Sequence, residues 1–272
     1  MYLSYWELRE KPFENTPDPR FFFQSRQHRE ALIRLLYTVY EAKGAALVTG
    51  EYGCGKTTLI RTLINEIDPK KYHVVLLNNP RWSAEDLLRE ILYQLGAGEL
   101  PERKRDVLSQ INDRLYQVVQ EGRHTVVIVD EAQVIDDLET FDELRMLLNF
   151  QFNDRFMLSL IFSGQPELRP KMREMPQLTQ RIAVKYHLVP LHAEETERYI
   201  DYRLALAGSM RNLFDQGATD LVYEFTKGVP RTINNLCDLA LALAAGNRLE
   251  AIDTTVIQNI IDSETAGGAF SW

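Results

Sequence analysis

Short apolar runs alternate with helical patterns through the first two thirds of the chain. Five runs are typical of buried strands, at residues 45–49, 72–77, 125–129, 156–162 and 183–188. Apolar residues at helical spacing before and between them predict helices at residues 27–42, 59–64, 84–95, 103–120 and 141–150. Strands that alternate with helices form parallel sheets. We therefore expect an α/β fold with a parallel five-stranded sheet.

The strand patterns stop after Pro190, and only helical spacing follows. Helices are predicted at residues 194–207, 216–226, 231–245 and 255–263. This change predicts four parts, namely an ordered aromatic and proline-rich arm at 1–25, an α/β domain at 26–191, a small all-helical lid at 192–265 and a loose C-terminus at 266–272.

Composition and charge narrow the classes of function. The chain has 272 residues, 45% of them hydrophobic, and a net charge of −8, which argues against a protein that coats nucleic acid. Its longest C-terminal apolar run, residues 239–245, is far shorter than the roughly 20 residues that span a bilayer. The N-terminus lacks the pattern of a secretory signal. We expect a cytoplasmic protein without a membrane span, whose Cys54 and Cys237 are reduced thiols.

The most specific motif lies between the first strand and its helix. The stretch fits G-x-x-x-x-G-K-[ST] and consists of Gly50, Glu51, Tyr52, Gly53, Cys54, Gly55, Lys56, Thr57 and Thr58. Such glycines let backbone N–H groups surround an anion at the positive end of a helix. A nucleoside triphosphate would place its β- and γ-phosphates at Lys56, Mg²⁺ at Thr57 and its α-phosphate at Thr58. An ordinary glycine turn is the alternative interpretation.

Two acids follow the third predicted strand. Asp130, at the carboxyl end of that strand, is expected to hold Mg²⁺ opposite Thr57, usually through a water. The adjacent Glu131 is placed to polarise the water that attacks the γ-phosphate. Two acids that open a helix are the alternative. Residues 78–81, Asn-Asn-Pro-Arg, lack the lysine-then-aspartate layout of GTPases, so ATP is the expected nucleotide.

The order of these parts resembles an AAA+ ATPase over nearly the whole chain. More narrowly, the chain resembles the ExeA/GspA-type ATPases of bacterial secretion and pilus assembly. The residues that carry this narrower resemblance are Pro12-Phe13, residues 17–23, His28, residues 164–168 and residues 228–231. The same clade includes transposition regulators of the TnsC/TniB type. The resemblance therefore specifies the chemistry more closely than the pathway.

The AAA+ resemblance implies a polar sensor of the γ-phosphate after the fourth strand, which here is Ser163 or Gln165. It also implies an arginine finger that reaches the nucleotide of a neighbouring subunit. Arg181, just before the fifth strand, looks like this finger, whose guanidinium would stabilise the charge that develops on the transferred phosphoryl group. A surface arginine that opens a strand is the alternative. The other candidates for this finger are Arg145, Arg155 and Arg173.

Two further contacts with the nucleotide are implied by the resemblance. Arg231 resembles the sensor arginine of the lid, and Pro230 starts its helix. The arm around Pro17 is expected to close the hydrophobic side of the adenine pocket, although its aromatic residues also suit a plain core role. Cys54, beside Lys56 and a helix N-terminus, suggests a redox switch, with a small turn residue as the alternative.

Together these features predict an ATPase that binds Mg·ATP between its two domains and uses hydrolysis to control the assembly of a homo-oligomeric ring or filament. The resemblance implies a role in envelope secretion or pilus assembly, with a protein partner in the inner membrane. Longer members of that family continue into a transmembrane segment and a wall-binding domain. This chain is therefore expected to be either a short stand-alone member or a fragment, and its coupling to the envelope would require a partner. The alternatives are a DNA-associated regulator that polymerises on DNA with ATP, and a nucleotide-operated switch.

Overall fold

The computed structural model describes residues 2–78 and 80–266, and these form two compact units. One unit comprises residues 26–52 and 56–188. The other comprises residues up to Ser25, Gly53–Gly55 and the chain from Val189 onward. Each unit has its own hydrophobic core.

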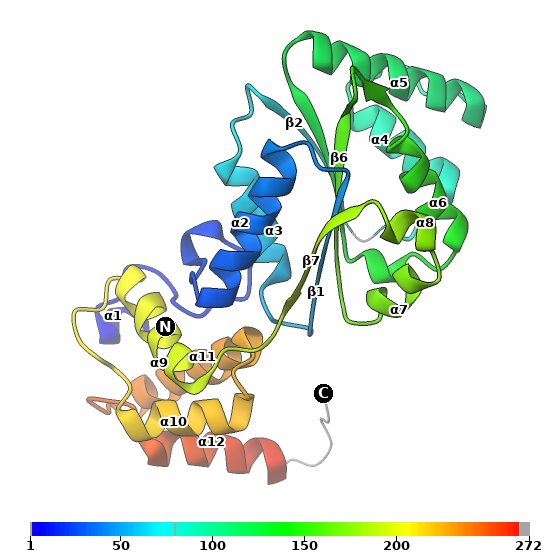
Figure 1. Ribbon diagram of the computed structural model, residues 1–272. Helices are drawn as coiled ribbons and strands as arrows, with labels where there is room; N and C mark the ends of the chain where they lie inside the picture. The colour runs from blue at the N-terminus through cyan, green and yellow to red at the C-terminus, as the bar shows by residue number, and fades with distance from the viewer. Residues whose placement is uncertain (1, 79, 267–272) are drawn as a thin grey trace. The chain divides into compact units, whose positions relative to one another are not determined.

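A parallel five-stranded sheet forms the centre of the unit that spans residues 26–52 and 56–188 (Figure 1). Its strands, in the order β2-β3-β6-β1-β7, are β2 (Tyr72–Asn78), β3 (His124–Asp130), β6 (Leu158–Gly164), β1 (Ala45–Gly50) and β7 (Ile182–Leu188). Every residue of β1 and β6 is buried. The sequence predicted this parallel sheet of five strands, and the structure confirms it.

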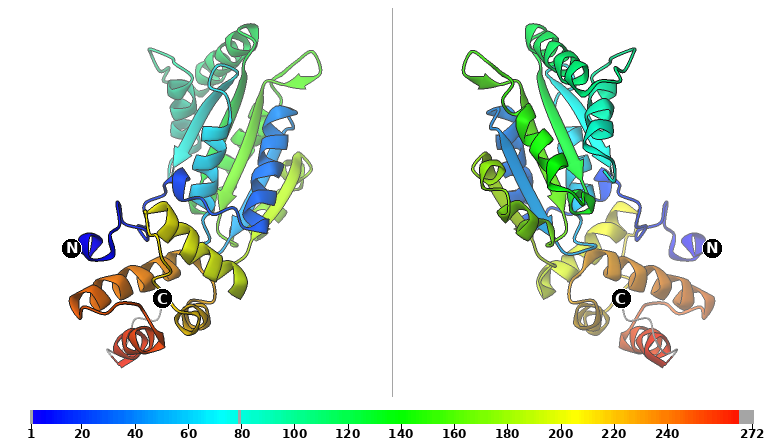
Figure 2. Two further views of the ribbon diagram at one scale, coloured as in Figure 1. Left: turned by 90° about the vertical axis from the view of Figure 1, so that its left-hand side faces the viewer. Right: turned by 90° about the vertical axis from the view of Figure 1, so that its right-hand side faces the viewer.

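Helices cover both faces of the sheet, and Figure 2 shows these layers from two sides. One face is covered by α2 (Arg26–Tyr40) and α3 (Lys56–Glu66) (Figure 1). The helices and turns associated with the other face are α4 (Ala84–Gln94), α5 (Lys104–Gln120), the 3₁₀ turn η2 (Ala132–Val134), α6 (Leu138–Leu147), α7 (Leu168–Arg173) and α8 (Pro176–Thr179). Burial on both faces explains why the central strands β1, β3 and β6 are largely apolar.

Two predicted boundaries differ from the structure for local reasons. The strand predicted at 156–162 is β6 (Leu158–Gly164), because Phe156 belongs to a separate hairpin of β4 (Gln151–Phe152) and β5 (Arg155–Phe156). The helix predicted at 141–150 is α6 (Leu138–Leu147), which starts earlier because the side chain of Asp137 accepts a hydrogen bond from Thr140 N at 2.6 Å.

The second unit is helical apart from an isolated bridge between Phe214 and Ile252. Its four long helices are α9 (Ala193–Leu206), α10 (Gln216–Thr226), α11 (Pro230–Gly246) and α12 (Thr254–Ala266). The N-terminal arm contributes α1 (Leu3–Trp6) and the 3₁₀ turn η1 (Pro19–Phe21). No helix within the described residues is long and apolar enough to cross a bilayer.

The arm is part of the core of this helical unit. Tyr2, Trp6 and Phe13 are buried among the residues of α9 to α12. Arg203 of α9 is also buried, and its guanidinium donates to the carbonyl oxygens of Pro12 and Glu14. The aromatic residues of the arm therefore pack as core, and the backbone of the arm supplies acceptors for a buried cation.

The same guanidinium has polar and aromatic neighbours inside the helical unit. It donates to Tyr199 Oη at 2.7 Å and to Asn234 Oδ1 at 3.1 Å, and lies 4.8 Å from the ring centroid of Phe21. None of these contacts of Arg203 is with a carboxylate. The hydrogen bonds and the aromatic ring instead offset the cost of burying the positive charge of its guanidinium.

A glycine fixes the chain where β7 leads into the helical unit. Gly228 adopts φ +75°, and a Cβ at this position would lie 1.9 Å from the carbonyl oxygen of Leu191. The two residues are also joined by a hydrogen bond of 2.9 Å from Leu191 N to Gly228 O. Only glycine satisfies both the backbone angle and the contact.

We expect Gly228→Ala to lower the free energy of unfolding of the helical unit by about 2–4 kcal/mol, because the new methyl group must displace the Leu191 backbone. Urea unfolding followed by circular dichroism measures this change. Gly246→Ala is the matched control, since no atom lies within 4 Å of its Cβ position, and it should be neutral or slightly stabilising. Equal stability of the two variants would contradict the prediction.

Candidate functional site

The glycine-rich loop connects the end of β1 at Gly50 with the start of α3 at Lys56. Gly53 and Gly55 adopt φ +81° and +91°, in the left-handed region that favours glycine. A Cβ on Gly50 would lie 2.8 Å from the carbonyl oxygen of Leu188 on the neighbouring strand. The glycines are therefore required both by the turn itself and by the close approach of β7.

The ammonium group of Lys56 lies within this loop. The side chain is only 5% exposed, and Nζ donates to Gly50 O at 2.8 Å and to Glu51 O at 3.0 Å. A cation held among the loop residues at a helix N-terminus suits a phosphate group. Lys56, Thr57 and Thr58 would hold the phosphates of a bound nucleotide.

Thr57 and Asp130 meet at the carboxyl edge of the sheet. Thr57 Oγ1 donates to Asp130 Oδ2 at 2.9 Å, while Asp130 Oδ1 accepts from Glu131 N at 3.0 Å. One hydroxyl and one carboxylate fit Mg²⁺, which usually keeps several waters and phosphate oxygens as ligands. Such an ion would neutralise phosphate charge. Within residues 2–78 and 80–266, no group of three or more His, Cys, Asp or Glu could hold a metal ion.

Glu131 has an unusual backbone conformation and a restrained side chain. Its φ and ψ are 55° and 37°, in the left-handed region that non-glycine residues rarely adopt. The Glu131 carboxylate accepts from Gln133 Nε2 and, in a long contact of 3.5 Å, from Gln165 Nε2. Strained residues of this kind cluster at functional sites. Both amides donate to the same carboxylate oxygen, Oε2, and so restrain the position of the side chain.

The two predicted sensors are in different environments. Ser163 is completely buried within β6, and its Oγ has no hydrogen-bond partner among the described residues. Gln165 lies just beyond the strand, where its amide contacts Glu131. Of the two candidates, the structure brings only Gln165 into contact with the Glu131 side chain.

Sequence reasoning missed Gln133 and Lys171. Gln133 Oε1 accepts from the backbone N of Gln165 at 3.0 Å, so this side chain joins the segment after β3 to the segment after β6. Lys171 Nζ donates to the carbonyl oxygens of Gln133 and Ile135, each at 2.7 Å. The available signal was a polar residue three positions after Asp130, which is too common to single out in a sequence.

The four candidate finger arginines differ in their contacts. Arg181 donates to Leu148 O at 3.1 Å and to Asn149 Oδ1 at 2.8 Å, beyond the end of α6. Arg145 forms an ion pair with Asp142 at 2.7 Å. Arg155 and Arg173 are exposed. Arg181 would have to leave these contacts to reach another subunit.

Residues Gly53–Gly55 are grouped with the helical unit, and they contact the start of α11. Arg231 N donates to Gly53 O at 3.3 Å, and a Cβ on Gly53 would lie 2.8 Å from Arg231 Cβ. Pro230 occupies the first turn of α11, as expected for a residue without a backbone N–H. Glycine is therefore needed at position 53 for two reasons. It adopts the left-handed φ of the turn, and it leaves room for the close approach of Arg231.

Two other predicted residues lie in the same unit. Cys54 is completely buried, so its thiol is shielded from reagents, which argues against the suggested redox switch. Pro17 lies in the arm, directly before the turn in which the side chain of Asp18 accepts from Arg20 N at 2.9 Å. Tyr52 and Glu51 are exposed residues of the loop.

Comparisons with known proteins agree with this geometry. Residues 39–172 match the AAA domain family. Over 250 residues, the chain is 34% identical to General secretion pathway protein A of Aeromonas hydrophila, an alignment that covers 90% of this chain and 45% of that protein. The chain spans about half the length of the curated relatives it matches.

Solved structures with the same fold are more distant in sequence. The Drosophila ORC bound to DNA has a TM-score of 0.72 and 17% identity, covering 97% of this chain and 66% of that chain. The Aeropyrum pernix ORC2 protein, in its ADPNP-ADP complexes, has a TM-score of 0.68 and 18% identity, covering 92% of this chain and 70% of that chain. At these identities the similarity shows the fold alone.

We expect Asp130→Asn to remove most of the Mg²⁺-dependent gain in affinity for a fluorescent ATP analogue, about tenfold, because a neutral amide is a poor magnesium ligand. Affinity without Mg²⁺ should change little, since the amide oxygen can still accept from Thr57. Anisotropy titrations with and without Mg²⁺ measure both values. Asp136→Asn changes the charge equally at an exposed position and serves as the control. An unchanged Mg²⁺ response in Asp130→Asn would remove Asp130 from the metal site.

Proposed function

Because the chain belongs to the AAA+ ATPases, of the type represented by General secretion pathway protein A, we propose that it binds and hydrolyses Mg·ATP. The observation that carries this proposal is the joining of the loop to the acidic strand end through Thr57 and Asp130 at 2.9 Å. In the proposed reaction, Lys56 and the loop amides hold the phosphates and Asp130 supports Mg²⁺ with Thr57.

Glu131 acts as the general base in this proposal. Its carboxylate would orient the attacking water and accept a proton from it, while the γ-phosphoryl group passes to that water and ADP leaves. Either Gln165 or Ser163 is the proposed sensor of the γ-phosphate, and Arg231 is the proposed contact from α11. The contacts of Gln133 and Gln165 with Glu131 support the idea that the base is held in place.

We further propose that hydrolysis controls the assembly of identical subunits and supports a bacterial envelope secretion or pilus-assembly system from the cytoplasmic side. The relative named General secretion pathway protein A supports this pathway, over the 45% of its length that the chain covers. A partner in the inner membrane or envelope would connect the ATPase to the machinery.

We expect Glu131→Gln to bind the ATP analogue normally and to lose turnover by at least about a hundredfold, because the amide cannot accept the proton of the attacking water. Lys56→Ala should lose binding as well, since it removes the buried cation of the loop. Phosphate release and anisotropy measure the two effects. Glu174→Gln is the exposed control. Full turnover in Glu131→Gln would contradict the assigned base.

The Glu131→Gln variant also tests the proposed role in envelope secretion or pilus assembly. In the organism that carries this chain, deleting its gene should lower protein export or pilus formation, and Glu131→Gln should fail to restore it. Normal export after deletion would contradict the envelope role. If ATP instead drives salt-sensitive filaments on duplex DNA, the DNA-associated regulator is the better assignment.

We expect Arg181→Ala to keep nucleotide binding and to lose about a hundredfold or more in turnover per subunit, as for arginines that act on a neighbouring site. Because Arg181 also contacts Leu148 and Asn149, the thermal stability of the Arg181→Ala variant must be measured in parallel. Arg173→Ala is the comparison variant. Loss of turnover in Arg173→Ala alone, at normal stability, would transfer the finger role to Arg173.

A further inference from the structure

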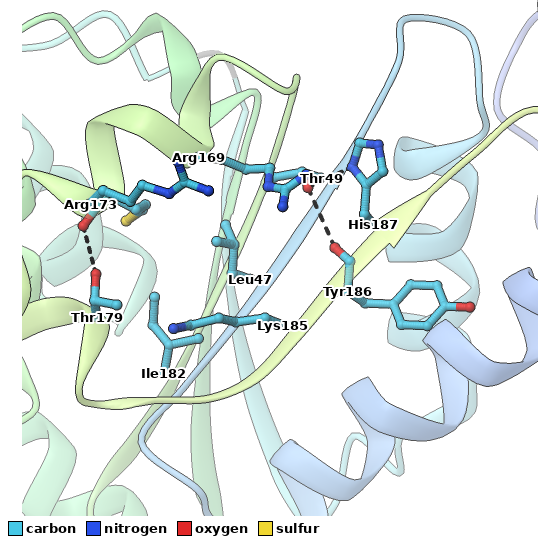
Figure 3. Close-up of a pocket in the computed structure, with 10 residues that line it drawn as sticks. Leu47, Thr49, Arg169, Arg173, Thr179, Ile182, Lys185, Tyr186 and His187 are labelled. Carbon is cyan, nitrogen blue, oxygen red and sulfur yellow. Dashed lines mark hydrogen bonds between the residues drawn. The ribbon is translucent and has the colours of Figure 1, made fainter.

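A pocket of about 300 Å³ lies between β1, β7 and α7, inside the unit that holds the sheet (Figure 3). Its apolar lining includes Leu47, Met172 and Ile182. Three cationic side chains also line it, Arg169 and Arg173 from α7 and Lys185 from β7. None of the roles proposed above uses the pocket as a binding site.

The strand register explains how the pocket forms. Leu47 pairs with Lys185 and Thr49 with His187, so these side chains share one face of the sheet. The Tyr186 side chain points to the opposite face (Figure 3). There its Oη donates to the carboxylate of Glu30 on α2 at 3.4 Å. The strand β7 is an edge strand with β1 as its single neighbour in the sheet. No strand of this sheet therefore lies beyond β7 at that edge.

The pocket concentrates positive charge in an acidic protein. Arg169, Arg173 and Lys185 are exposed, and none forms an ion pair with a residue of the described part, although the chain has a net charge of −8. The pKa of His187 is lowered, chiefly by burial and then by the positive charge of Arg169, against a smaller opposing effect of Glu51. An anionic group would therefore be favoured here.

We propose that this pocket docks an extended acidic segment of a partner protein, with an apolar side chain next to its carboxylates. The apolar side chain would contact Leu47, Met172 and Ile182, and the carboxylates would pair with Lys185 and Arg169. An extended segment can also pair with the edge of β7, where its alternate side chains would face the pocket side of the sheet.

Charge and shape favour this occupant over two others. A small inorganic anion would leave the apolar lining and the methylene stems of the cationic residues without contacts. Duplex DNA requires a broad basic face, whereas Glu167 and Glu174 are exposed on the segments that flank this pocket. An acidic peptide with an apolar side chain offers negative charge and apolar surface close enough together to fill one pocket.

The test uses a fluorescein-labelled peptide of sequence Glu-Asp-Leu-Asp-Phe-Asp-Glu and anisotropy titration of the whole chain. Lys185→Glu and Arg169→Glu should each weaken binding about tenfold or more, because each replaces an attractive charge with a repulsive one. Lys70→Glu makes the same change at an exposed lysine outside the pocket, and should leave the affinity within about twofold. Thermal unfolding of each variant verifies that it is folded.

Two altered peptides and two competitors complete the experiment. Replacing the acids by lysine, or the Leu and Phe by serine, should abolish binding, and raising the salt concentration should weaken it. The proposal is overturned if the peptide does not bind, or if Lys185→Glu and Arg169→Glu bind it normally. It is equally overturned if the serine peptide or inorganic pyrophosphate binds as tightly, or if duplex DNA displaces the peptide and loses affinity in the same variants. Binding requires no ATP turnover, so the result is independent of the proposed hydrolysis.

Discussion

The parallel alignment of the buried strands is the constraint on which the site depends. Because β1, β3 and β6 run in the same direction, their carboxyl ends meet at one edge of the sheet. This alignment brings Thr57, which follows β1, to Asp130 at the end of β3, although 73 positions separate them in the chain. Gln133 then joins the ends of β3 and β6 through Gln165. The polar contacts of the site are consequences of apolar packing between strands and helices.

Much of the fold could be predicted from the sequence, because burial on both faces makes the central strands β1, β3 and β6 largely apolar. The AAA+ fold with a parallel five-stranded sheet and a helical C-terminal region is confirmed. Local pairing and capping were harder to predict. The short hairpin of β4 and β5 interrupts an apolar run at Phe156, and the cap at Asp137 starts α6 three residues before the expected helix. Such features depend on one or two side chains, which periodicity does not resolve.

Part of the candidate site could also be predicted, because the residues of the loop are contiguous in sequence and so are the two acids at the end of β3. The structure brings Thr57 and Asp130 together. The roles of Arg181 and Arg231 stay predictions, since they depend on a nucleotide and, for Arg181, a neighbouring subunit. The hydrogen bonds to the Glu131 carboxylate could not be predicted from the sequence, because one of the two donors, Gln165, lies 34 positions away in the chain. The N-terminal arm shows the same limit, since its buried acceptors for Arg203 lie on the backbone.

The grouping of Gly53–Gly55 with the helical unit has a consequence for any ligand of the loop. These residues belong to one compact unit, while Tyr52 and Lys56 on either side of them belong to the other. The chain therefore crosses between the two units twice within five residues, once at each end of Gly53–Gly55. A ligand that binds one conformation of these three residues more tightly than another would increase the population of that conformation, and a second molecule that shifts the same population would change the affinity for the ligand by the same factor. The affinity for a ligand of the loop and the conformation of Gly53–Gly55 would thus be linked in one thermodynamic cycle.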